Sequence, residues 1–305
     1  MDDPAVTALS ELVAGGVRRG ELRRGDRVLR WVEAGAGRPT VILDAGLAEP
    51  GSLSWAGVLP ALSAQAKVIA YDRAGVGASD PVPALSLDTE IADLAALATK
   101  AGDGPCVLVG HSWGGLLAQL AAYRHPGLVA GLVLVDPAHE EILATAPWQV
   151  RALMTARGAA VRLLQPLGLL ERIIRSSFRP FAGRLSSDPR VQGLVLDAYA
   201  ASYRSRSQVR MLGDENRLSL ASVPAIRQIR AASALPDVPV AVLSATKGLP
   251  PATRDRWTAL QAGLVRATAH GEHIVAPDTG HAIHQERPEL VTGAVTRVLQ
   301  LATQP

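Results

Sequence analysis

The residues whose types and spacing point most clearly to catalytic chemistry form the pentapeptide Gly110-His111-Ser112-Trp113-Gly114. It lies between an apolar run at 106–109 and a helix-like run at 116–123. A serine with glycine two residues before and after it, between a strand and a helix, is typical of a sharp turn. The glycines are needed because the backbone passes close by. Such a turn exposes a hydroxyl at a helix N-terminus, where the dipole favours developing negative charge. The pattern predicts that Ser112 is a nucleophile.

A serine hydroxyl needs an adjacent base to act as a nucleophile at neutral pH. Of the seven histidines, His281 is the best placed, because it follows a strand-like run and a turn signal at 277–280. His284 is the rival. We expect it to start the next helix and to pack on the inserted helical segment described below. His111 is expected to point away from the nucleophile, into the scaffold.

The elements that must position these residues alternate between short apolar runs and helical patterns, which indicates parallel βαβ units. Most of the runs are continuously apolar, as strands covered on both faces must be. A hairpin over 21–33, turning at Gly25-Asp26, is expected to form an antiparallel edge. Strands are predicted at 27–33, 40–43, 67–71, 106–109, 132–135, 240–243 and 273–276, and helices at 87–98 and 290–298.

The alternation stops between 138 and 235, where helical, leucine-rich runs such as 161–174 replace it. We interpret 138–235 as an inserted helical cap, with 1–137 and 236–305 as the core domain. The cap contains 14 Arg and 7 Asp or Glu. This excess is compatible with an anionic ligand, a membrane surface or nucleic acid. A solvated helical face is the interpretation we favour.

Composition narrows the class of protein. The chain has 305 residues, of which 48% are hydrophobic and 19% charged, and this excludes a mostly disordered protein. Cys106 is the only cysteine, so no internal disulfide and no cysteine metal site is expected. The start of the chain lacks a signal-peptide pattern, and no apolar stretch is long enough to span a membrane. We therefore predict a cytoplasmic protein that binds neither membrane nor nucleic acid, and the oligomeric state stays open.

The order of strands, serine turn, insertion and late histidine resembles the α/β-hydrolase fold family over about residues 20–302. The octapeptide at 72–79, Asp-Arg-Ala-Gly-Val-Gly-Ala-Ser, resembles that family's D-R-x-G-x-G-x-S turn. Gly280-His281 resembles its catalytic histidine site, and Asp44-Ala45-Gly46-Leu47 occupies the place of its oxyanion loop. The resemblance implies an α/β fold with a mostly parallel eight-stranded sheet, flanking helices and an inserted helical cap.

The acid that orients the histidine is less obvious. The family usually carries it just after the strand predicted here at 240–243, but the next residues, 244–248, contain no acid. Asp255 is the first, and it lies inside a predicted helix. Some members carry the acid at the end of the preceding strand, which is Asp136 here. We favour Asp136 over Asp255.

The resemblance also implies an oxyanion hole formed by the backbone N–H groups of Trp113 and Leu47. Trp55 and Trp113 are candidate pocket walls or core residues. The expected function is a serine hydrolase that cleaves an ester, thioester or lactone of a small-molecule acyl substrate, with no metal or organic cofactor. A lyase or acyltransferase using the same Ser112, His281 and Asp136 is one alternative, and a non-catalytic ligand receptor is another. Serine argues against an epoxide hydrolase of this fold, where the family would carry aspartate.

Overall fold

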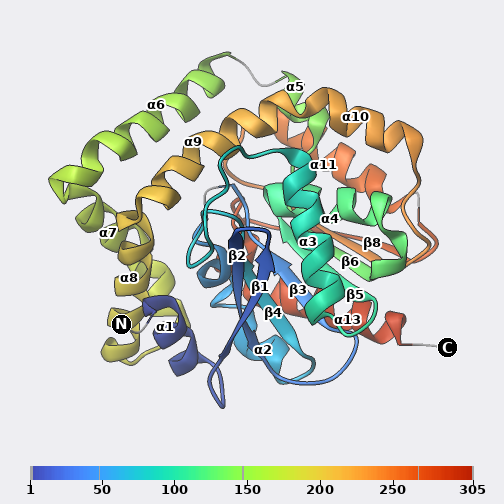
Figure 1. Ribbon diagram of the computed structural model, residues 1–305. Helices are drawn as coiled ribbons and strands as arrows, with labels where there is room; N and C mark the ends of the chain where they lie inside the picture. The colour runs from blue at the N-terminus through green and yellow to red at the C-terminus, as the bar shows by residue number, and fades with distance from the viewer. Residues whose placement is uncertain (1–2, 48, 146–147, 267, 304–305) are drawn as a thin grey trace.

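The computed structural model describes residues 3–47, 49–145, 148–266 and 268–303, in which eight strands form one sheet with helices on both faces (Figure 1). The strand order is β1-β2-β4-β3-β5-β6-β7-β8. Strand β2 runs antiparallel to both of its neighbours, and the other pairings are parallel. The strands are β1 (Arg18–Arg24), β2 (Arg27–Ala34), β3 (Val41–Asp44), β4 (Val68–Asp72), β5 (Cys106–His111), β6 (Val129–Val135), β7 (Val240–Ala245) and β8 (Gly271–Ala276).

The predicted strands are confirmed, with small shifts at their ends. The predicted hairpin is also present, because Arg24 pairs with Arg27 across the turn at Gly25-Asp26 and β1 forms an edge of the sheet. The core helices are α1 (Pro4–Leu12), η1 (Gly51–Trp55), α2 (Leu59–Ser63), α3 (Leu87–Ala101), α4 (Ser112–Arg124), η2 (Pro126–Leu128), α11 (Pro251–Val265), α12 (Ile283–Glu286) and α13 (Pro288–Ala302).

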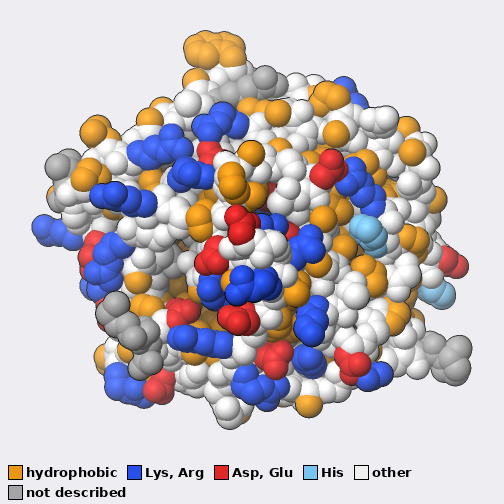
Figure 2. Space-filling model, viewed as in Figure 1, with side chains coloured by type: hydrophobic (Ala, Val, Ile, Leu, Met, Phe, Trp, Pro, Cys, Tyr) orange, Lys and Arg blue, Asp and Glu red, His pale blue; other side chains and the backbone are white. Residues whose placement is uncertain are grey.

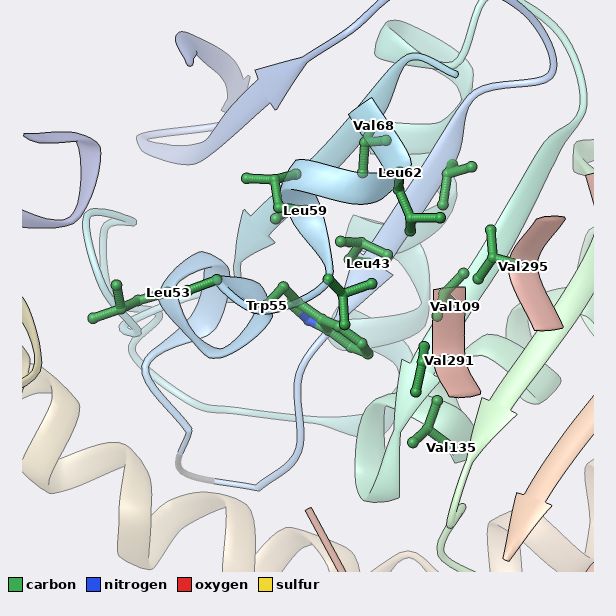
Figure 3. Packing of buried hydrophobic residues seen from close by; sticks show 14 of the residues in the cluster. Leu43, Leu53, Trp55, Leu59, Leu62, Val68, Val109, Val135, Val291 and Val295 are labelled. Carbon is green, nitrogen blue, oxygen red and sulfur yellow. The ribbon is translucent and has the colours of Figure 1, made fainter. Parts of the chain in front are cut away.

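The central strands are apolar throughout because successive side chains point to opposite faces and both faces are covered. On one face Leu43, Val109 and Val135 pack against Val291 and Val295 of α13, together with residues of α2 (Figure 3). On the other face alternate strand residues pack against α3, α4 and α11. This double cover fixes the carboxyl ends of β5, β6, β7 and β8 along one edge, where sites form in parallel sheets.

Between β6 and β7 the described chain is helical, and in Figure 1 these helices cross the upper and left side of the sheet. The expected helix over 161–174 is divided at Gly168, whose φ of +68° is a left-handed conformation that favours glycine. The division into cap and core stays a prediction. These helices are α5 (Glu140–Thr145), α6 (Trp148–Leu164), η3 (Gln165–Leu167), α7 (Leu169–Leu185), α8 (Pro189–Arg204), α9 (Arg206–Ala221) and α10 (Val223–Ala232).

Many cap arginines lie next to carboxylates. Arg175 contacts Glu171 at 3.2 Å, and Arg227 contacts Glu141 at 2.7 Å. Basic and acidic side chains are interspersed over the face seen in Figure 2. This supports the interpretation of the arginine excess as a solvated surface. Among the described residues, no helix is both long enough and apolar enough to cross a membrane.

Candidate active site

Ser112 begins helix α4 directly after strand β5 ends at His111. Its φ of +50° lies in the left-handed region, which is strained for a residue with a side chain. A Cβ added to Gly110 would lie 2.3 Å from the carbonyl oxygen of Gly114, and one added to Gly114 would lie 2.4 Å from that of Asp44. The sharp turn therefore requires both glycines, and it presents the Ser112 hydroxyl at the start of a helix.

His281 reaches this hydroxyl from the loop after β8, and its Nε2 lies 2.9 Å from Oγ of Ser112. The loop is tied to the end of β7, because the backbone N–H groups of Thr246 and Lys247 donate to the carbonyl oxygen of Thr279. The side chain of His281 is 43% exposed, so the base is open to solvent and to a substrate.

Asp136 lies at the end of β6 with a φ of +41°, and its Oδ2 is 2.6 Å from Nδ1 of His281. Its Oδ1 accepts hydrogen bonds from Nε2 of Gln261 at 3.0 Å and from the backbone N–H of Ala245 at 3.2 Å, and Arg254 Nη1 lies 3.3 Å away. Burial opposes ionisation, but His281, Gln261 and Arg254 together lower the pKa of Asp136. The carboxylate is thus ionised and directed at the histidine.

Asp255 is placed differently. It is exposed on helix α11, whereas its neighbour Arg254 is buried and points to Asp136. Arg254, Trp257 and Gln261 follow helical spacing on α11, so one face of this helix contacts the site. The Trp257 Nε1 donates to the carbonyl oxygen of Pro137 at 2.8 Å. These three residues were not predicted from the sequence, although their helical spacing after β7 was a visible signal.

Arg73 holds the loop after β3 that carries the predicted oxyanion residue Leu47. Its guanidinium donates to the carbonyl oxygens of Ala45 at 2.5 Å and Gly46 at 2.7 Å. It also binds Asp44 at 2.6 Å and Glu215 of helix α9 at 2.8 Å. Arg73 thus links this loop to helix α9, and the backbone of Asp44 and Ala45 lies close to Gly114 of α4. The donation of hydrogen bonds to an oxyanion by Leu47 and Trp113 stays a prediction.

Both tryptophans considered as pocket walls are completely buried. Trp113 lies in the apolar cluster under α3 and α4, and its Nε1 donates to Glu90 at 3.0 Å. Trp55 lies in the opposite apolar cluster (Figure 3). The centroid of its ring is 4.8 Å from that of His284. Their observed surroundings are core packing, and a pocket-lining role for Trp55 stays a prediction.

The rival histidine, His284, is buried within α12, one residue after the helix begins. Its ring packs on Trp55 and on His111, so it belongs to the interior beneath His281. His111 points away from Ser112, as expected, but its Nε2 contacts the backbone of His281.

Glu90 makes the stability of the buried charged cluster around Arg73 depend on pH. The cluster also contains Asp44 and Glu215. Burial raises the pKa of Glu90 to about 8, and Arg73 only partly offsets this while Glu215 and Asp44 add to it. Because the folded-state pKa is raised, its stabilising contribution is present below the unfolded value of 4.5 and is lost as pH rises through about 8.

As the pH rises from 5 to 8.5, we expect the free energy of unfolding to fall less in the Glu90→Gln variant than in the wild type. One proton limits the difference to about 1.4 kcal/mol per pH unit. Urea unfolding at a series of pH values measures it, with Glu21→Gln, at an exposed carboxyl, as the control. If the free energy of unfolding depends on pH in the same way in Glu90→Gln and in the wild type, the raised pKa of Glu90 is contradicted.

Comparisons with known proteins identify the family of the chain. A family model described as "Alpha/beta hydrolase family" matches residues 34–294. Epoxide hydrolase 4 of Mus musculus is 34% identical over 117 residues, which are 37% of this chain and 32% of that protein. Lipase LipV of Mycobacterium tuberculosis is 45% identical over 71 residues, 23% of this chain and 27% of that protein. The aligned stretches thus span about a third or less of these relatives.

The fold is shared with solved structures. A thermophilic esterase from Thermogutta terrifontis, solved with malate bound, superposes with a TM-score of 0.65 at 21% identity. The match covers 94% of this chain and 100% of the esterase. At this identity the likeness shows the fold alone.

Proposed function

Because this chain belongs to the alpha/beta hydrolase family, we propose that it is a serine hydrolase that cleaves a carboxylic ester, thioester or lactone through an acyl-enzyme. One observation carries the proposal. The Ser112 hydroxyl, the His281 ring and the Asp136 carboxylate form one chain of contacts, of 2.9 Å and 2.6 Å. This is the arrangement of a nucleophile, its base and the acid that orients the base.

The chemical steps follow from these contacts. Oγ of Ser112 attacks the acyl carbonyl while its proton passes to Nε2 of His281. Asp136 holds the proton on Nδ1 and stabilises the imidazolium that forms. The imidazolium then protonates the leaving alcohol or thiol, and the acyl group stays on Ser112. A water molecule, deprotonated by His281, attacks the acyl-enzyme and releases the acid.

The negative charge of each tetrahedral intermediate needs donors at the start of α4. The backbone N–H groups of Trp113 and Leu47 are our candidates, and loss of one such donor typically costs about 2.7–4 kcal/mol of transition-state stabilisation. The carbonyl oxygens of the Leu47 loop are held by Arg73, which fixes the backbone beside Ser112 before substrate binds.

Two relatives bear names for different reactions, a lipase and an epoxide hydrolase. The nucleophile separates these reactions for our chain. Serine attack on an epoxide would leave an ether, which an activated water does not cleave, whereas serine attack on an acyl group leaves a hydrolysable ester. Ser112 therefore favours acyl chemistry. We also propose that the cap over 138–235 selects the acyl substrate.

A fluorophosphonate probe and product analysis test the proposal together. We expect the probe to modify Ser112, as located by mass spectrometry, and to abolish release of free acid from p-nitrophenyl esters of graded chain length. An unsaturated product or an ester of an added alcohol would instead indicate the lyase or the acyltransferase. No labelling of the folded protein, and no turnover of the ester series, would favour a ligand receptor.

A further inference from the structure

A buried cluster of Glu49, His111 and His284 lies directly behind the proposed base. The Nε2 of His111 is 2.9 Å from the carbonyl oxygen of His281, and its ring centroid is 4.6 Å from that of His281. On the other side, Nδ1 of His111 is 2.9 Å from Oε1 of Glu49. The second carboxylate oxygen of Glu49 accepts a hydrogen bond from the backbone N–H of Gly46 at 2.9 Å.

These contacts determine where the protons of His111 are. A carbonyl oxygen only accepts hydrogen bonds, so Nε2 of His111 must carry a hydrogen. Its Nδ1 then faces a carboxylate oxygen, and a bare nitrogen lone pair at 2.9 Å from that oxygen would be repelled. A proton between the two atoms removes the repulsion. Although burial opposes ionisation, His111 lowers the pKa of Glu49 well below its usual range, so this proton lies on His111 and makes it an imidazolium paired with the Glu49 carboxylate. Burial opposes this charge, but Glu49 outweighs it and raises the pKa of His111.

The third member of the cluster behaves differently. His284 is completely buried, and within the described part of the chain neither of its ring nitrogens has a hydrogen-bond partner. Burial and the nearby His111 lower the pKa of His284 to about 3. It is neutral, and its Nε2 is 3.6 Å from Glu49, too far for a hydrogen bond.

The cluster connects the two loops that a serine hydrolase must keep in register. Glu49 holds Gly46, next to the predicted oxyanion residue Leu47, and through His111 it holds the backbone of His281. Both loops approach Ser112 from distant parts of the sequence, and the strands that precede them, β3 and β8, are not neighbours in the sheet that the described residues form. A shift of about 1 Å in such an arrangement can lower a rate about 100-fold.

We propose that Glu49 and His111 are positioning residues that lock His281 and the oxyanion loop in reacting geometry over Ser112. This inference rests on the proposed serine hydrolase function. Neither side chain touches the reacting atoms, so both act through the backbone of the residues they hold.

Two variants of Glu49 separate positioning from simple packing. A glutamine can accept from Gly46 with its oxygen and donate to Nδ1 of a neutral His111 with its amide, so Glu49→Gln preserves the link. Glu49→Ala removes it. We expect Glu49→Ala to lower kcat about 10- to 100-fold with KM changed by less than about threefold. Glu49→Gln should stay within about threefold of wild-type kcat, and so should His284→Gln, the matched control in the same cluster.

Nitrogen-15 NMR of the histidine rings supplies a readout independent of activity and of folding yield. At pH 6.5, the pKa of an unperturbed imidazole, we expect His111 to be mostly doubly protonated in the wild type and mostly neutral in Glu49→Gln. A neutral His111 in the wild type, or a Glu49→Ala enzyme with wild-type kcat, would overturn the inference. So would one equivalent of zinc in the purified protein, because the same three side chains bring ligand atoms within 4.8 Å of one another.

The outcomes also distinguish the inference from the function on which it rests. If the wild-type protein neither hydrolyses esters nor reacts with the fluorophosphonate at Ser112, the proposed function fails. If it does both and Glu49→Ala does so equally well, only the positioning role fails.

Discussion

The Ser112→Ala variant is expected to lose about 10⁴- to 10⁶-fold in kcat for ester hydrolysis while its melting temperature stays within a few degrees of the wild type. The hydroxyl is the proposed nucleophile, so its removal prevents formation of the acyl-enzyme on Ser112. Within the described part of the chain, Oγ of Ser112 contacts the ring of His281 and no other polar side chain, so its removal leaves core packing intact. The strained φ of +50° is retained, because alanine and serine carry the same Cβ.

A buried serine outside the site gives the matched control. Ser54 is completely buried, and within the residues that the structure describes its hydroxyl has no hydrogen-bond partner. We expect Ser54→Ala to keep wild-type kcat and to be neutral or slightly stabilising, because it removes an unsatisfied polar group. Burst kinetics with a p-nitrophenyl ester should show an acyl-enzyme in wild type and Ser54→Ala only. Full turnover in folded Ser112→Ala protein would exclude a serine nucleophile.

The positions of most strands along the chain could be read from the sequence because local composition determines them. Strands covered on both faces must be apolar, and the helices between them must be amphipathic, so periodicity alone separates the two. Strand ends were less predictable: β5 continues through Gly110 to His111, because the glycine needed for the turn is also tolerated in the strand. Helix α1 was not predicted. It depends on an N-cap by Asp3 and on packing with the distant helix α8.

The candidate site likewise contains residues that the sequence predicts and residues that it does not. Ser112 and His281 carry local signals, a glycine-flanked turn and a turn after a strand, and the structure brings their side chains together. The partners that fix them are distant in sequence. Arg73 pairs with Glu215, Glu49 with His111, and a single sequence does not encode such pairs in any local pattern. Only the folded chain shows which carboxylate satisfies which cation.

The choice between the two candidate acids has a large expected effect. We expect Asp136→Asn to lower kcat about 10⁴-fold and Asp255→Asn to change it by less than about twofold. An asparagine amide facing Nδ1 of His281 would hold the proton on Nε2, and the ring could not then accept the proton of Ser112. Asp255 is exposed and lies one residue from the side chain that does reach the site.

The stability of Asp136→Asn must be measured beside its rate, because the variant leaves the buried cation of Arg254 without its ion-pair partner. Breaking a buried pair in this way can cost about 3–5 kcal/mol. The double variant Asp136→Asn with Arg254→Met removes the stranded charge and should recover part of that unfolding free energy. It should not recover kcat, because the wrong histidine tautomer remains. A double variant that regains both would show that Asp136 supports the fold and not the base. If Asp255→Asn instead lowers kcat strongly, the acid lies on helix α11, and the contact between Asp136 and His281 is not the functional one.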